Sequence, residues 1–362
     1  PFHIQLILFF LIESKVLTLD QMSDESINKN FHLKKRKEIS LEKYVAGILS
    51  RDISSLSAAI TLIESANSKH RELAEQIIEK CLPHSGKSIR VGITGVPGVG
   101  KSTFIESFGT FLTTQERKIA VLAIDPSSQK NGGSILGDKT RMEELSTNKN
   151  AYVRPSPAKD SLGGVARNTR ETIILCEAAG YDTILIETVG VGQSEIAVHG
   201  MVDFFLLLML SGAGDELQGI KRGIMEMADA IVITKADGEN IENSKRAATE
   251  YKNALHLFPA NENGWIPKVG ACSAYDNSGI SEVWKTLQSY QNHTITNGSF
   301  SKKRQNQAKY WMHETINEEL KRTFFDDSSV SKKIKKLEKE VTQGTLSPFK
   351  AAHLLLDKND KL

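Results

Sequence analysis

The chain has 362 residues, of which 40% are hydrophobic and 25% are charged, and this composition suits a soluble globular protein with one large domain plus helical additions. Its 46 basic and 44 acidic side chains leave a net charge of +2, which gives no electrostatic case for binding nucleic acid or an anionic membrane. The three cysteines are widely separated and form no C-x-x-C pair, which excludes a thiol-based zinc or redox signature.

The N-terminal part divides into two stretches of different character. Residues 1–40 begin with an apolar run that is too short to span a bilayer, and they are expected to be disordered or extraneous, with Met22 as the more natural start. Residues 41–84 carry apolar side chains at three- and four-residue steps, which predicts a small helical region.

Residues 85–296 alternate between strand and helix patterns, and residues 297–362 lose the strand pattern. The expected strands are 89–94, 119–124, 182–187, 203–209, 230–234 and 267–272, and the expected helices are 102–113, 163–179, 217–228, 241–254, 278–291, 301–325, 329–342 and 347–357. The alternation predicts an α/β fold, a mostly parallel sheet with helices on both faces and helical extensions at both ends. Site residues should then follow the carboxyl ends of strands.

One run between a strand and a helix carries a specific signal. Residues 95–102 read Gly-Val-Pro-Gly-Val-Gly-Lys-Ser, an unbroken G-x-x-x-x-G-K-[ST] pattern, and this context predicts the phosphate loop of a P-loop NTPase. Lys101 would reach the β- and γ-phosphates, and the Ser102 hydroxyl would ligate Mg²⁺. The residues expected to contact the nucleotide here are Gly95, Val96, Pro97, Gly98, Val99, Gly100, Lys101, Ser102 and Thr103.

Three acidic residues are candidates for the magnesium site. Glu187 ends an apolar strand, and Gly190 lies three residues beyond it, where its N–H can sense the γ-phosphate. Asp125 ends another strand, and Asp138 lies in a glycine-bearing loop. Either aspartate could reach Mg²⁺ directly or through water, because magnesium keeps several waters in such sites; an ordinary loop acid is the alternative for Asp138.

A second motif predicts the base. Thr234, Lys235 and Asp237 follow a strand and match the [NT]-K-x-D pattern. A carboxylate at Asp237 would accept hydrogen bonds from the N1–H and 2-amino groups of guanine, which adenine cannot offer. Lys235 would lie along the base and brace the phosphate loop, and Thr234 in place of the usual Asn is expected to reduce rigidity. Ser273 and Ala274 fit the segment whose backbone contacts the guanine O6.

Together these runs resemble the MeaB/ArgK family of P-loop GTPases, which act as chaperones of methylmalonyl-CoA mutase and related adenosylcobalamin-dependent mutases. The resemblance covers about residues 41–356. The segments that carry it are 95–103, 124–128, 133–142, 187–195 and 214–221.

The resemblance implies GTP/GDP and Mg²⁺ as ligands, slow GTP hydrolysis, homodimers formed through the C-terminal helices, and an acyl-CoA mutase as partner. It implies that the chain gates cofactor loading and protects the mutase. It places Ser102, Asp125, Asp138 and Glu187 in the magnesium shell. It also places Asp215, Glu216 and Lys221 in a mobile loop that responds to nucleotide and partner.

Four residues are candidates for the hydrolysis step: Lys101, Glu187, Gln193 and Lys221. Gln193 is the candidate for orienting the attacking water, and Lys221 for a cation supplied when the partner docks. His199 is conceivable as a general base, but a packed or solvated helix histidine is the preferred interpretation.

Other functions stay open. A metal-delivery GTPase of the nickel type is the main alternative, although the nine histidines are scattered and Cys81 and Cys272 are isolated. A transport-linked ATPase or kinase, or a small-molecule kinase, is a further alternative. The few cysteines and the nucleotide site together predict a reducing, cytoplasmic setting.

Overall fold

The chain divides into two units, Pro1–Ser40 and Leu41–Leu362, and every element below belongs to the second. The computed structural model describes residues 39–65, 67–125, 142–157, 162–188, 193–212, 222–258 and 261–357. At a few positions inside elements, Asp125 and Gln193 among them, it describes the backbone and not the side chain.

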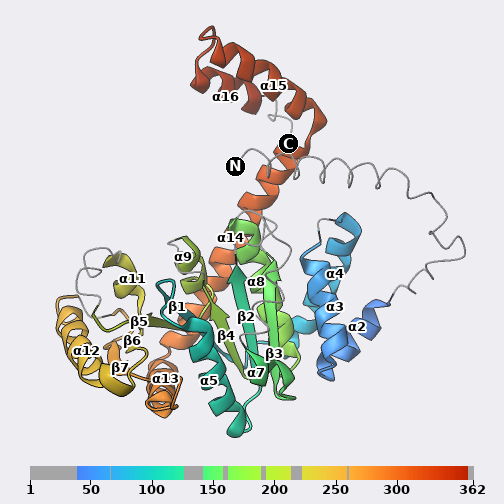
Figure 1. The fold of residues 1–362 in the computed structure, drawn as a ribbon. Helices are drawn as coiled ribbons and strands as arrows, with labels where there is room; N and C mark the ends of the chain where they lie inside the picture. Colours follow the sequence, from blue (N-terminus) through green and yellow to red (C-terminus); the bar gives the residue numbers. More distant parts are fainter. Residues whose placement is uncertain are drawn as a thin grey trace, which may run out of the picture. The chain divides into compact units, whose positions relative to one another are not determined.

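A seven-stranded sheet forms the centre of the fold, and all of its strand pairs are parallel (Figure 1). The strand order is β3-β2-β4-β1-β5-β6-β7. The strands are β1 (Ile89–Gly95), β2 (Ile119–Asp125), β3 (Ala151–Pro157), β4 (Thr183–Glu187), β5 (Phe204–Met209), β6 (Ala230–Ile233) and β7 (Lys268–Ala271). The predicted α/β fold with a parallel sheet is therefore confirmed.

The strand β3 is absent from the prediction. Its sequence, Ala-Tyr-Val-Arg-Pro-Ser-Pro, has a short apolar run followed by an arginine and two prolines, which reads as a loop. The structure pairs it with β2 along its whole length, from Ala151 opposite Ile119 to Pro157 opposite Asp125. Because β3 is an edge strand, its prolines need not donate to a second neighbour, and the sheet tolerates them.

Most helices follow the predicted alternation with shifted ends, but the short helices at 143–147 and 193–199 are not among the expected ones. Their bounds are α2 (Leu41–Leu49), α3 (Ile53–Ile63), α4 (Ser68–Cys81), α5 (Lys101–Thr114), α7 (Glu143–Thr147), α8 (Leu162–Ala178), α9 (Gln193–His199), α11 (Arg222–Met227), α12 (Ile241–Leu255), α13 (Ile280–Thr296), α14 (Ser299–Asp326), α15 (Ser328–Thr342) and α16 (Pro348–Leu356), with 3-10 turns at Leu82–His84 and Gly238–Asn240. Of the helix expected at 217–228, residues 217–221 lie outside the described residues.

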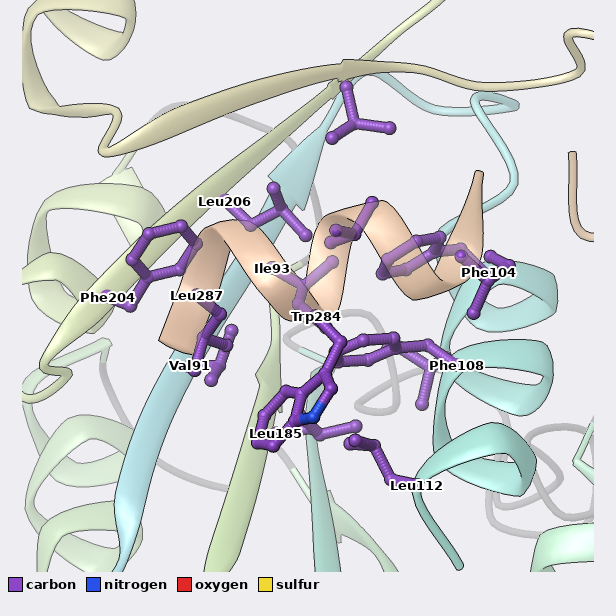
Figure 2. Packing of buried hydrophobic residues seen from close by; sticks show 14 of the residues in the cluster. Val91, Ile93, Phe104, Phe108, Leu112, Leu185, Phe204, Leu206, Trp284 and Leu287 are labelled. Atoms are coloured by element: carbon purple, nitrogen blue, oxygen red, sulfur yellow. The ribbon is translucent and has the colours of Figure 1, made fainter. Parts of the chain in front are cut away.

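The sheet buries both faces. On one face, alternate side chains of β1, β4 and β5 meet the apolar sides of α5 and α13, as Figure 2 shows for Ile93, Leu206, Phe108 and Trp284. On the other face, side chains such as Phe205 pack with α8, α9 and the N-terminal helices α2–α4. The period-two alternation along β5 assigns neighbouring residues to opposite cores, so the layers on both faces position the strand ends.

The long helix α14 binds the chain segment between α9 and β5. Trp311 Nε1 donates to the carbonyl of Gly200 at 3.0 Å, and Gln307 Nε2 donates to that of Val202 at 2.8 Å. At the other end of α14, α15 packs against both α14 and α16. Further along α14, Glu319 pairs with Arg167 of α8 at 2.7 Å and with Arg71 of α4 at 3.4 Å, so α14 attaches the C-terminal helices to the rest of this unit along much of its length.

Candidate functional site

The phosphate loop joins the end of β1 to the start of α5, and its glycines adopt backbone conformations that other residues rarely take. The φ angle is +152° at Gly95, +83° at Gly98 and +93° at Gly100. A Cβ atom at Gly95 would lie 2.5 Å from the carbonyl oxygen of Leu208 on β5. The glycines therefore permit the close turn that a phosphate-binding backbone needs.

Lys101 begins α5 and folds back over the loop. Its Nζ donates to the carbonyl oxygens of Gly95 at 2.9 Å and Val96 at 3.4 Å, and the residue is only 9% exposed. Burial lowers the pKa of Lys101, while the negative charges of Glu187 and Glu195 act in the opposite direction. A buried ammonium group that is paired mainly with carbonyl oxygens would gain from an anion, which is what a nucleotide phosphate supplies.

Ser102 and Glu187 meet beside the loop. The strands β1 and β4 are neighbours, and their register places Glu187 opposite Ile93. The Ser102 hydroxyl donates to Oε1 of Glu187 at 3.0 Å. A hydroxyl and a carboxylate in contact are hard oxygen ligands of the kind that Mg²⁺ prefers, so these two side chains fit a magnesium ion.

Thr188 fixes this corner of the site, and sequence reasoning gave it no role. Its N–H donates to the carbonyl of Ile93 at 3.0 Å, and its buried hydroxyl donates to Oγ1 of Thr94 at 2.9 Å. The end of β4 is therefore attached to the end of β1, just before the phosphate loop. A threonine after a strand-ending acid is the only local signal for this bond.

The guanine-type motif follows β6 and contacts the phosphate loop directly. The hydroxyl of Thr234 donates to the carbonyl of Val99 at 2.8 Å. Lys235 has a φ angle of +56°, and its Nζ donates to the carbonyl of Gly98 at 3.0 Å. Thr234 thus keeps a direct hydrogen bond to the loop although it replaces the usual asparagine.

Asp237 and Ser273 come together from two strands. The Ser273 hydroxyl donates to Oδ2 of Asp237 at 2.6 Å, and the N–H of Ala236 donates to the carbonyl of Cys272 at 3.1 Å. Because β6 and β7 are adjacent and parallel, the segments after them lie side by side. A carboxylate therefore lies at the carboxyl edge of the sheet, next to the residues expected to contact guanine O6.

Several predicted site residues lie outside this description. Asp138, Gly190, Asp215, Glu216 and Lys221 are not among the described residues, and for Asp125 and Gln193 only the backbone is described. Their roles stay predictions from the sequence.

Glu195 belongs to the neighbourhood of Lys101 and had no role in the sequence interpretation. It lies in the first turn of α9, is 1% exposed, and its charge opposes the lowering of the Lys101 pKa by burial. The only sequence signal for a role of Glu195 was its position in the segment 187–195, which carries part of the family resemblance.

His199, at the end of α9, behaves as a packed side chain. Its ring meets that of Phe205 edge-on with 5.5 Å between the centroids. Burial and the positive charge of Lys303 lower its pKa to about 4. The preferred interpretation of His199 as a packed helix residue therefore agrees with its surroundings.

Neither a further metal-binding cluster nor a membrane-spanning helix occurs among the described residues. Within the described ranges, no group of three or more His, Cys, Asp or Glu side chains could hold a metal ion. None of the helices in the described part of the chain combines the length and apolar character needed to cross a bilayer.

A parallel sheet with a glycine loop, a buried loop lysine and a guanine-type motif at one edge is the architecture of a P-loop GTPase. The family described as "Methylmalonyl Co-A mutase-associated GTPase MeaB" matches residues 56–329, and the chain belongs to this family. The protein is accordingly a guanine-nucleotide-binding GTPase.

Relatives of the chain support the same assignment. It is 48% identical to the mouse protein named "Methylmalonic aciduria type A homolog, mitochondrial", over 87% of this chain and 79% of the mouse protein. It is also 48% identical to a probable GTPase of Mycobacterium tuberculosis, over 84% of this chain and 91% of that protein. Among solved structures, a crystal structure titled "LAO/AO transport system kinase" matches with a TM-score of 0.70 and 35% identity, covering 88% of this chain and 98% of that one.

Proposed function

We propose that the chain is a GTP-dependent chaperone of an adenosylcobalamin-dependent acyl-CoA mutase, with methylmalonyl-CoA mutase as the first candidate. It would gate the loading of the cofactor and protect the mutase. The observation that carries this proposal is the 48% identity, over most of the chain, to the mouse protein named for methylmalonic aciduria type A. The family's own description as mutase-associated supports the same partner.

Magnesium belongs to this proposal. Ser102 and Glu187 would hold Mg²⁺, since their oxygens already meet at 3.0 Å, and Asp125 and Asp138 are the further ligands proposed from the sequence. The ion would neutralise negative charge on the phosphates. The chain's own residues would position the nucleotide: the phosphate loop around the phosphates, and Asp237 at the guanine edge.

Phosphoryl transfer needs little covalent help from a protein, so positioning and charge neutralisation account for most of the rate. Lys101 would contact the β- and γ-phosphates, and Gln193 would orient the attacking water. Turnover would stay slow until the partner brings a further cation into place. Lys221, in the segment 214–221, is the proposed cation, and Asp215 and Glu216 would couple that segment to the mutase.

The first test measures GTP hydrolysis by the full chain with and without purified methylmalonyl-CoA mutase. We expect stable association with a non-hydrolysable GTP analogue and faster hydrolysis when the mutase is present. Lys221→Ala should abolish the stimulation, whereas Lys285→Ala, which alters an exposed lysine of α13, should leave it intact. No association and no stimulation would contradict the mutase proposal, and full stimulation of Lys221→Ala would contradict the role of Lys221.

Two finer points belong to the same proposal. The chain would form a homodimer through α14–α16, which light scattering of the purified protein tests. A cytoplasmic location is expected from the sequence, whereas the mouse relative's name places that protein in mitochondria; microscopy of the tagged chain in its own cells decides between them.

A further inference from the structure

Tyr275 is the most exposed of the chain's large hydrophobic side chains in the described residues, and it lies beside the proposed guanine site. Its side chain is 90% exposed. Within those residues, the side chain of Tyr275 takes part in no hydrogen bond, ion pair or ring contact, and only its backbone N–H donates a hydrogen bond, to Ser273. An exposed tyrosine ring either has no function or is available to contact a ligand. The structure of the surrounding loop helps to decide between these two possibilities.

The backbone at Tyr275 is attached to the Asp237 carboxylate through a single hydroxyl group. Ser273 Oγ donates to Oδ2 of Asp237 at 2.6 Å and accepts from the N–H of Tyr275 at 3.1 Å. Asp237 is the residue proposed to bind the N1–H and 2-amino groups of guanine. The backbone of Tyr275 is therefore only one hydroxyl group away from the carboxylate proposed to bind the base, and the exposed ring belongs to the same corner of the site.

The loop from Ser273 to Gly279 is held in one shape by its own polar groups. Ser273 N–H donates to the carbonyl of Ser278 at 2.9 Å, and the carboxylate of Asp276 accepts from Ser278 N–H at 3.0 Å. Asn277, whose φ angle is +62°, accepts at its Oδ1 from the Ser107 hydroxyl of α5 at 2.6 Å. At Gly279 a Cβ atom would lie 2.2 Å from the carbonyl of Ala271.

None of these bonds involves the tyrosine side chain, so the loop does not need the ring in order to fold. A preformed loop that leaves an aromatic ring in solvent keeps the entropic cost of placing that ring low when a flat ligand arrives. Lys235, on the neighbouring segment, extends to the carbonyl of Gly98 and is expected to cover one face of the base.

We propose that the Tyr275 ring packs against the guanine base of the bound nucleotide, on the part that Lys235 leaves uncovered. This inference rests on the proposed guanine site at Asp237 and adds a second recognition element to it. Asp237 selects guanine by hydrogen bonds, whereas Tyr275 strengthens binding of any purine by stacking, since every base offers a π-face. The two residues therefore have separable effects.

The test uses calorimetric titration of the full chain with GDP and with IDP, which lacks the 2-amino group. Tyr275→Ala is expected to weaken both ligands by the same factor, about 10-fold, with faster dissociation and an unchanged GDP-to-IDP affinity ratio. Tyr275→Phe should bind like the wild type, because the ring is retained. Tyr310→Ala, which removes another exposed tyrosine on α14, is the matched control and should bind GDP normally.

Asp237→Ala separates the inference from the site on which it rests. If Asp237→Ala lowers the GDP-to-IDP ratio and Tyr275→Ala binds GDP within about twofold of wild type, the guanine site stands and the stacking role of Tyr275 is wrong. If Asp237→Ala changes nothing, the guanine assignment itself is wrong. If Tyr275→Ala impairs only association with the mutase, the ring is a protein contact, which also overturns the inference.

Discussion

Charged side chains lie at both ends of the parallel strands, here called the carboxyl edge and the amino edge of the sheet. The two ends pair these side chains in different ways. At the carboxyl edge, Lys101 and Lys235 donate to backbone carbonyls of the phosphate loop. The hydroxyls of Ser102 and Ser273 each donate to a carboxylate, Glu187 in the first case and Asp237 in the second. The partners in these four hydrogen bonds are neutral carbonyl and hydroxyl groups on one side of each bond, and in the proposed function a nucleotide and a metal ion would take their place.

At the amino edge, charged groups are paired with each other and buried. Arg90 makes two hydrogen bonds to Glu177, at 3.0 and 3.1 Å, and Arg304 makes two to Asp203, at 2.8 and 2.6 Å. The side chains of Glu177 and Asp203 are 0% and 1% exposed. Arg304 also donates to the carbonyl of Ser88, so this network attaches the start of α14 to the sheet.

The carboxyl edge is therefore suited to ligand binding, and the amino edge to stabilising the fold. A partner at the carboxyl edge can be exchanged for a ligand at little cost, whereas removal of a partner at the amino edge leaves an uncompensated buried charge. Substitutions at the carboxyl edge should therefore reduce nucleotide chemistry without unfolding the protein. Substitutions at the amino edge should unfold it without altering the chemistry of the molecules that stay folded.

The largest effect is expected for Lys101→Ala. Loss of the proposed phosphate lysine should slow GTP hydrolysis by about 10²–10³-fold, since it removes a preorganised positive charge from the transferring phosphoryl group. The free energy of unfolding should change by no more than about 1 kcal/mol, because the variant also removes a buried cation whose pKa burial already lowers. Phosphate release and chemical denaturation measure the two quantities.

The matched control for Lys101 is Lys285→Ala, an exposed lysine that should show neither effect. A Lys101→Ala protein that unfolds readily would mean that the lysine holds the loop together through Gly95 and Val96. The carboxyl edge would then contribute to stability as the amino edge does.

Glu177→Ala tests the opposite edge. Because it leaves Arg90 buried without its carboxylate, the free energy of unfolding should fall by about 3–5 kcal/mol. At a temperature where the variant is folded, its affinity for GDP should equal that of the wild type. Glu282→Ala removes an exposed ion pair on α13 and should leave the denaturation curve unchanged. Weakened GDP binding by folded Glu177→Ala would show that the edges are coupled.

The carboxyl edge was largely predictable from the sequence and the amino edge was not. The phosphate loop and the Thr234–Asp237 motif depend on consecutive backbone conformations, so their residues are neighbours in the chain. Arg90 and Glu177 are 87 positions apart, and Arg304 and Asp203 are 101 apart. No local pattern marks such pairs, because only the folded topology brings them together.

The same reasoning explains why the strand β3 was not predicted. Continuous apolar strands such as β5 are easily recognised in the sequence, since both of their faces are buried. The edge strand β3 contains Arg154, Pro155 and Pro157 and resembles a loop, because its pairing with β2 on one side is enough to hold it. Local composition indicates whether both faces of a strand are buried. It does not indicate whether a strand has a neighbour on one side or on both.

A smaller effect concerns pH at the amino edge, where two buried groups act in opposite directions. Burial raises the pKa of Asp229 to about 6, although Lys303 and the N–H of Phe205 oppose the shift and Asp203 adds to it. The folded chain therefore binds more protons than the unfolded chain between about pH 4 and 6, and stability falls as pH rises through this window. His199, with its pKa lowered to about 4, contributes the reverse slope up to its unfolded value.

Asp229→Asn should therefore leave the His199 slope uncompensated. Over pH 4–6 the free energy of unfolding of this variant should rise relative to the wild type, by at most about 3 kcal/mol. Urea denaturation at half-unit steps of pH measures the difference. His199→Gln is the converse control, because its stability should fall relative to the wild type over the same range. Parallel pH curves for Asp229→Asn and wild type would contradict the raised pKa.

The smallest effect is expected for Trp311 of α14, which contacts the chain segment after α9. Its indole N–H donates to the carbonyl of Gly200, directly after α9, and α9 also carries Glu195, whose charge acts on Lys101. Trp311→Phe keeps an aromatic face for Arg90 but removes the donor, so the free energy of unfolding should fall by about 1–2 kcal/mol. Tyr310→Phe, at an exposed neighbour, should be neutral. If the edges are independent, GDP affinity stays constant in both variants; a changed affinity in Trp311→Phe alone would identify α9 as the route by which the C-terminal helix and the nucleotide site communicate.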